Sequence, residues 1–166
     1  YIQSGLDRQK LSSAPQATPR DLIRRAYYDL LGLPPTPAQI LKFETDFELS
    51  GRAAFAELID ELLKSPHYGE RWGRHWLDLV RYADTAGDAA DFPVPEAYKY
   101  RNYVIDSFNS DKPYNQFIKE QLAGDLLPDK DKDSITATGF YRLGIWDDEP
   151  ADRELARYEY LDDILR

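Results

Sequence analysis

Residues 67–84 combine helical periodicity with two tryptophans and a dense set of ionisable side chains, and no other stretch constrains the fold as strongly. At 100° per residue its apolar positions fall on one side of a helix; they are Trp72, Trp76, Leu79, Val80 and Ala83. We therefore expect two indole rings to anchor this helix in the core, with the rest of the fold built around it.

The opposite side of the same helix is polar and carries Arg71, Arg74, His75, Asp78, Arg81 and Tyr82. Residues three and four apart are neighbours on a helix, so the imidazole of His75 and the carboxylate of Asp78 are expected to meet. A carboxylate beside an imidazole fixes its tautomer and raises its basicity. The pair is therefore a candidate general base, metal ligand or haem ligand, and a purely structural ion network is the alternative.

Helix start signals recur along the chain. Thr18-Pro19 and Thr36-Pro37 each place a capping hydroxyl before a proline suited to the first turn, and Gln39 completes a capping box. Apolar spacing predicts further helices over about 18–31, 36–49, 52–64, 96–108, 114–123, 134–143 and 151–166. No alternating strand pattern with a hairpin turn is present. The sequence predicts an all-α fold, an irregular multi-helix bundle of about seven helices with long loops.

The length of 166 residues suits one domain with a substantial core. Residues 1–17, with an amphipathic piece followed by a Ser/Ala/Pro loop, are interpreted as an N-terminal approach segment. Residues 18–166 are interpreted as a single α-helical domain.

Composition excludes several classes of function. Thirty acidic against 21 basic residues give a net charge of −9, and phosphate binding needs a basic face, so we expect no nucleic-acid partner. No apolar run reaches the roughly 18–20 residues that a membrane span requires. The absence of cysteine removes disulfides, thiolate catalysis and covalent haem attachment within these residues.

Two loops carry acidic residues that are candidates for chemistry. Asp84, Asp88 and Asp91 follow the tryptophan-containing helix, where they could bind calcium, contact a sugar or serve in glycoside hydrolysis; solvated or capping acids are the alternative. Their spacing does not match an EF-hand loop. Trp146 adjoins further acids and is interpreted either as a sugar platform or as a buried anchor.

Six segments resemble, in the same order, motifs of one known family: DLLGLPPTP (29–37), SPHYGERW (65–72), RHWLD (74–78), RYAD (81–84), YRNYVI (100–105) and EQLAGD (120–125). The family is the N-terminal domain of unknown function of planctomycete cytochrome c-type proteins. The resemblance extends from about residue 18 to residue 166.

The resemblance implies the N-terminal part of a larger, periplasmic or secreted multidomain protein. In the family a Cys-x-x-Cys-His motif follows the segment corresponding to 162–164, so haem c is implied for the parent protein. The implied partners are the C-terminal domains, together with a redox partner or a polysaccharide, since neighbours of the family often degrade polysaccharides. The resemblance gives no established reaction.

Three functional hypotheses follow. In the first, the chain supports haem-linked electron transfer: His75, or else His67, ligates iron, and Arg71, Arg74 or Arg81 pairs with haem propionates. It predicts a pocket opening on the polar face of the tryptophan-containing helix, toward its C-terminal end.

The second hypothesis is a glycan-active or glycan-binding domain in which His75, Asp84, Asp88 and Asp91 converge in one cleft. The third is a structural interaction module, in which the Arg/His/Asp row is satisfied internally and no cleft exists.

Overall fold

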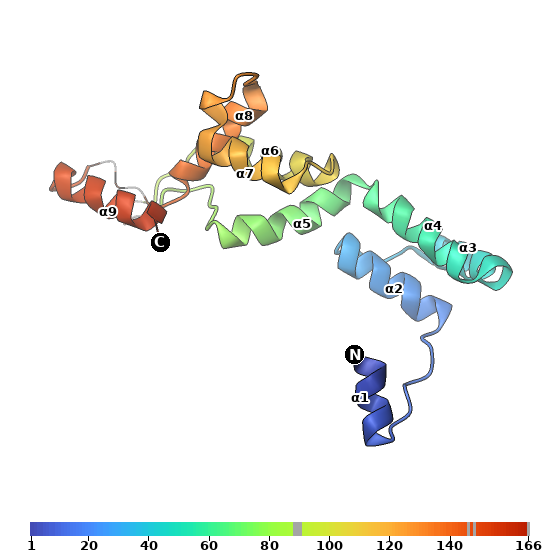
Figure 1. The fold of residues 1–166 in the computed structure, drawn as a ribbon. Helices are drawn as coiled ribbons and strands as arrows, with labels where there is room; N and C mark the ends of the chain where they lie inside the picture. Colours follow the sequence, from blue (N-terminus) through green and yellow to red (C-terminus); the bar gives the residue numbers. More distant parts are fainter. Residues whose placement is uncertain (88–90, 146, 148, 166) are drawn as a thin grey trace. The chain divides into compact units, whose positions relative to one another are not determined.

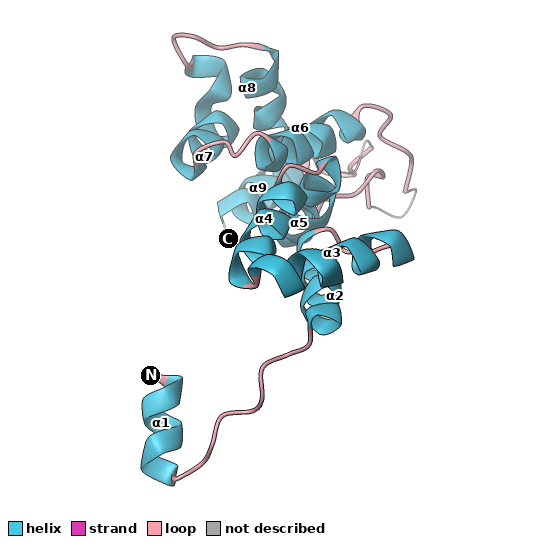
Figure 2. Cartoon of the chain, turned by 90° about the vertical axis from the view of Figure 1, so that its right-hand side faces the viewer, coloured by secondary structure: helices cyan, strands magenta, loops and turns pink. Residues whose placement is uncertain are grey.

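The computed structural model describes residues 1–87, 91–145, 147 and 149–165. These residues form nine α-helices and two 3₁₀ helices and contain no strand, so the predicted all-α class is confirmed, with nine α-helices in place of about seven (Figures 1 and 2). The chain divides into two compact units, residues 1–62 and 63–166. The single domain expected over residues 18–166 stays a prediction.

The first unit contains helices α1 (Ile2–Gln9), α2 (Pro19–Leu30), α3 (Pro37–Ser50) and α4 (Arg52–Leu63), the last ending at the boundary. Helix α1 lies in the expected approach segment and buries none of its residues. The core lies between α2, α3 and α4, and its largest buried side chains are Ile23, Tyr27, Phe43, Leu58 and Leu62.

The predicted caps of the first unit are confirmed. The hydroxyl of Thr18 accepts the backbone N–H of Asp21, and Thr36 exchanges bonds with Gln39 in a capping box. Each cap satisfies backbone donors that the first turn leaves without an intrahelical partner. The starts of α2 and α3 are therefore encoded locally.

The second unit contains helices α5 (Pro66–Leu79), α6 (Ala97–Asn109), α7 (Tyr114–Ala123), α8 (Lys132–Ala137) and α9 (Arg153–Leu165). Two 3₁₀ helices, η1 (Gly124–Leu126) and η2 (Thr138–Arg142), precede and follow α8. Helices α8 and η2 together take the place of the single helix predicted over 134–143. Helices α6, α7 and α8 lie together, and their core comprises Tyr100, Tyr103, Val104, Phe117 and Ala137 (Figure 1).

Helix α5 packs against α6 through a face that differs from the predicted one. Gly69 and Gly73 are its buried residues, and the absence of a side chain lets the two backbones approach closely. Trp76 is half-buried as expected, but Trp72 is 37% exposed and Leu79 is 73% exposed. The prediction of two anchoring indoles is therefore wrong for Trp72, because the glycines define the contact face.

Helix α5 also ends earlier than the predicted boundary near residue 84. Val80 is its C-cap, and Arg81 adopts a left-handed conformation with φ +59°. Among the described residues between Arg81 and α6, Thr85 and Pro93 form an isolated bridge. Ala83, expected in the core, is exposed.

No helix in the part of the chain that the structure describes is long and apolar enough to cross a bilayer.

Candidate functional site

The predicted row of ionisable groups on α5 does not form a unit. Asp78 pairs with Arg74, whose Nε lies 3.7 Å from the carboxylate, and not with His75. The imidazole of His75 is exposed and lies against the ring of Trp72, with 5.3 Å between ring centroids. Arg71 is half-buried, and its Nε has no hydrogen-bond partner among the described residues. The oriented imidazole–carboxylate pair is therefore absent from the described contacts of α5.

The second histidine is also engaged on the surface. The Nδ1 atom of His67 lies 2.7 Å from the Glu70 carboxylate, one turn along α5. Both side chains of this pair are exposed. His67 is therefore placed as a surface group of the first turns of α5.

The acids of the following loop serve local contacts. Asp84 accepts a 2.5 Å hydrogen bond from the Tyr82 hydroxyl and lies 3.7 Å from Arg101. Burial, reinforced by the Asp84 bond, raises the pKa of Tyr82. Asp91 accepts from the side chain of Thr85 and the backbone N–H of Gly87, and these bonds lower its pKa. Asp88 and Trp146 lie outside the described residues.

Arg81 joins the end of α5 to α9. Its guanidinium donates two bonds of 2.7 Å to the carboxylate of Asp163, and this ion pair raises the pKa of Arg81. Asp163 and Tyr160 lie over Gly144, where a Cβ would stand 2.9 Å from an Asp163 oxygen. Such planar bidentate pairing fixes the guanidinium geometrically. It holds Arg81 at the boundary of two hollows.

The first hollow, called here the α5-end cavity, has a volume of about 680 Å³. It lies beyond the C-terminal end of α5, between the loop at 81–87, the start of α6, helix α8 and the segment 138–145. Its walls are mainly alanine, glycine and aliphatic residues, among them Ala86, Val94, Ala97, Ile135, Leu143 and Ile145. Its basic residues are Arg81, Lys99 and Arg142, and Glu96 is ion-paired with Lys99.

The second hollow, of about 700 Å³, lies along α9 and shares Arg81, Arg142 and Ile145 with the α5-end cavity. It is more polar, because it also contains two further arginines and four acidic side chains. The volume of each hollow is in the range of small-molecule sites. The apolar walls distinguish the α5-end cavity as the better candidate, since burial of apolar surface is the main source of ligand affinity.

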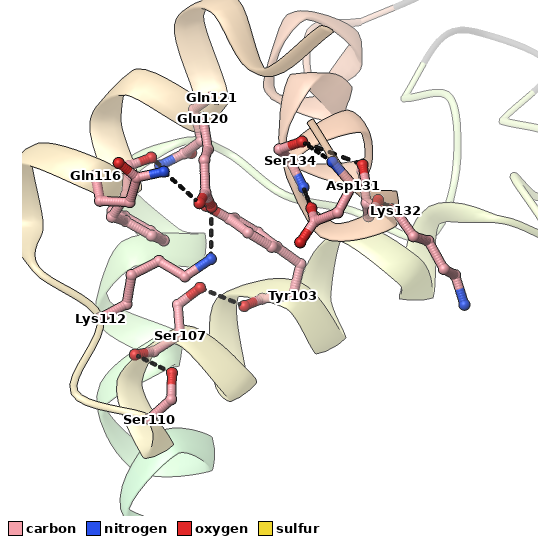
Figure 3. Close-up of polar contacts among 12 residues, drawn as sticks. Tyr103, Ser107, Ser110, Lys112, Gln116, Glu120, Gln121, Asp131, Lys132 and Ser134 are labelled. Carbon is pink, nitrogen blue, oxygen red and sulfur yellow. Dashed lines mark hydrogen bonds and ion pairs between the residues drawn. The ribbon is translucent and has the colours of Figure 1, made fainter. Parts of the chain in front are cut away.

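Sequence reasoning missed a buried polar network between α6 and α7. The Glu120 carboxylate, 7% exposed, accepts bonds from Tyr103 Oη at 2.8 Å, Gln116 Nε2 at 2.9 Å and Lys112 Nζ at 2.5 Å (Figure 3). The same ammonium lies 4.6 Å from the centre of the Tyr103 ring. The only local signal was the i, i+4 spacing of Gln116 and Glu120, because the other partners are distant in sequence.

The electrostatics of this network favour a charged Glu120. Burial acts to raise the pKa of the carboxylate, but the bonds from Lys112, Gln116 and Tyr103 outweigh it and the pKa is lowered. Burial and the bond to Glu120 raise the pKa of Tyr103. The polar groups of this network bond one another, and we therefore interpret the network as structural.

A second buried network joins α5 to α6 and α7. The indole Nε1 of Trp76 donates to Tyr100 Oη at 3.1 Å and to Gln121 Oε1 at 3.2 Å, while the Tyr100 hydroxyl donates to the same amide oxygen. Burial raises the pKa of Tyr100 to about 12. Tyr100 also lines the α5-end cavity, so this network fixes the position of one residue of the cavity wall.

The chain matches, over residues 1–166, the model of the family named PSCyt2 and described as "Protein of unknown function (DUF1549)". The chain is a member of the PSCyt2 family. No curated protein and no solved structure is significantly similar to it. The family name supports only the general part of the expectation, namely that this is a cytochrome-associated domain.

Neither hollow of this PSCyt2 domain presents a histidine to a haem iron among its described lining residues. The α5-end cavity contains no His, Met or Cys among its lining residues, and neither His67 nor His75 lines either hollow. The guanidinium of Arg81 keeps three N–H donors beyond the two bonded to Asp163, and these suit a carboxylate such as a propionate. No group of three or more His, Asp and Glu among the described residues is placed to hold a metal ion.

Proposed function

We propose that this PSCyt2 chain is a non-catalytic helical module that binds a largely apolar group in the α5-end cavity. The observation that carries the proposal is the cavity itself, about 680 Å³ in volume, with alanine, glycine and aliphatic walls. Apolar concave sites of this size are the usual places for small-molecule or cofactor binding. The electron-transfer hypothesis expected a pocket on the polar face of the tryptophan-containing helix. The cavity lies beyond the end of α5 instead, and of the residues predicted for that face only Arg81 lines it.

The finer part of the proposal is a contribution to haem-linked electron transfer in a periplasmic or secreted parent protein. It is supported by the family name and by Arg81, the one predicted propionate partner that lines the cavity. We propose that the module supports a redox centre held by the C-terminal domains. Its own residues bind the apolar group and exclude water from it.

The glycan hypothesis has less support from the described residues. His75, Asp84 and Asp91 line neither hollow. Each contacts a near neighbour on its own helix or loop, and Asp84 also lies near Arg101. A hydrolase needs two carboxylates facing one another across the scissile bond. A polysaccharide therefore remains a proposed partner of the parent protein and not a proposed substrate of this module.

The proposed function predicts that the neutral apolar dye N-phenyl-1-naphthylamine binds the chain and brightens. The Ala97→Trp variant, with an indole in the cavity wall at the start of α6, is expected to weaken binding at least about tenfold, because the bulky ring occupies volume that the dye would fill. Dye fluorescence titration measures the dissociation constant.

The control is Ala38→Trp, which adds the same indole to the exposed first turn of α3. It should bind the dye like the unsubstituted chain. Equal binding by the two variants, or no dye binding by the unsubstituted chain, would overturn the proposed function.

A further inference from the structure

We infer that the α5-end cavity takes an organic monoanion: a compact apolar body that carries a single carboxylate or sulfonate. This inference rests on the proposed function and adds the ligand class to it. It is carried by the joint presence of apolar walls and a rim of basic side chains in one hollow.

The walls determine the body of the ligand. Ala83, Ala86 and Ala97 present only methyl groups to the cavity, and its glycines present no side chain at all. At Gly139 a Cβ would stand 3.4 Å from the Tyr100 ring, so the bare backbone of Gly139 packs closely on this buried ring. Small and aliphatic residues suit a compact apolar ligand, because they leave room and offer apolar contact area. The hydroxyls of the three threonines that also line the cavity are bonded within the chain.

The rim determines the charged group. Three basic side chains line the cavity; Lys99 is ion-paired with Glu96, and Arg81 with Asp163. Arg81 uses two N–H groups on Asp163, which lines the second hollow and not this one. A guanidinium has five N–H donors, so three remain for a ligand or water. A fixed guanidinium beside an apolar surface is suited to an anionic oxygen.

The whole-molecule charge favours a ligand with one negative charge over a polyanion. At −9 the chain repels a ligand with several negative charges at long range. A single anionic group loses little to this repulsion and gains most of its affinity from burial of its body.

The test compares two dyes with the same aromatic body. 8-Anilino-1-naphthalenesulfonate carries one sulfonate, and N-phenyl-1-naphthylamine lacks it. We expect the sulfonate to bind about tenfold more tightly to the full chain, the effect of one hydrogen-bonded ion pair. Fluorescence titration of both dyes measures the ratio.

A charge-only pair of variants locates the effect. Ile135 lines the cavity from α8 and is 51% exposed, so both Ile135→Glu and Ile135→Gln are expected to fold. Relative to Gln, Glu should weaken binding of the sulfonate about tenfold through like-charge repulsion and leave binding of the neutral dye within about twofold.

Equal affinity for the two dyes, or equal sulfonate binding by the two Ile135 variants, would overturn the monoanion inference and leave the proposed apolar site standing. Displacement of the sulfonate by inorganic pyrophosphate at similar concentration would also overturn it, in favour of a polyanion site. If neither dye binds, the proposed function and the inference both fail.

Discussion

Replacing Gly69 with alanine is expected to lower the free energy of unfolding by about 2 kcal/mol. The new Cβ would stand 2.4 Å from the backbone oxygen of Ile105 and 2.7 Å from the side chain of Asn109. Since the nearest atom belongs to the backbone of α6, the two helices must separate, and overpacking of this kind typically costs about 1–3 kcal/mol or more. The better helix propensity of alanine returns at most about 1 kcal/mol.

The matched control is Gly73→Ala, one turn further along α5. There the Cβ would meet Val104 Cγ1 at 3.4 Å and Ile105 Cγ1 at 3.5 Å, which is close to ordinary contact. Its stability should stay within about 1 kcal/mol of the unsubstituted chain. Urea unfolding followed by circular dichroism measures both. Equal effects at the two positions would contradict the proposed close approach of α5 and α6 at Gly69.

Replacing Lys112 with methionine is expected to cost about 3 kcal/mol at pH 7. The substitution leaves the Glu120 carboxylate, 7% exposed, without the ammonium that lies 2.5 Å away. Breaking a buried ion pair by removing one partner costs about 3–5 kcal/mol, and the bonds from Tyr103 and Gln116 moderate this. Lys119→Met on the exposed side of α7 is the control, expected within about 0.5 kcal/mol of the unsubstituted chain.

The pH dependence of this network has a defined sign. The pKa of Glu120 is lowered from its ordinary value of 4.5 in the folded chain, so its stabilising contribution is present above pH 4.5 and is lost as the pH falls through the folded value. The stability advantage of the unsubstituted chain over Glu120→Gln should therefore shrink as the pH is lowered from 6 toward about 3. An advantage that grows on acidification would contradict the ion pair.

Helix positions were predictable where local chemistry decides them. Thr18 and Thr36 cap their helices as expected because the interaction joins residues three apart. The buried face of α5 was not predictable in this way. Large apolar residues usually mark a buried face, but here Gly69 and Gly73 mark it, since close backbone approach needs small residues. The prediction that Trp72 is buried was therefore wrong.

The candidate site was largely hidden from sequence reasoning because its parts are distant in the chain. Arg81 was singled out, but its partner Asp163 lies 82 positions away and no local pattern connects them. Apart from the first turn of α6, the cavity walls come from loops and short helices, which lack strong periodicity. The sequence emphasised His75 and Asp78, but they form separate surface contacts. Asp78 pairs with Arg74, one turn before it, and His75 lies against Trp72.

The most direct measurement is an amide chemical-shift titration of the ¹⁵N-labelled chain with 8-anilino-1-naphthalenesulfonate. Gly87, Gly139 and Gly144 line the α5-end cavity, whereas Gly51 and Gly73 lie elsewhere. We expect the amide signals of the three cavity glycines to shift progressively to saturation and those of the other two to stay in place. Unchanged cavity glycines, or larger shifts at Gly51 and Gly73, would contradict binding in this cavity.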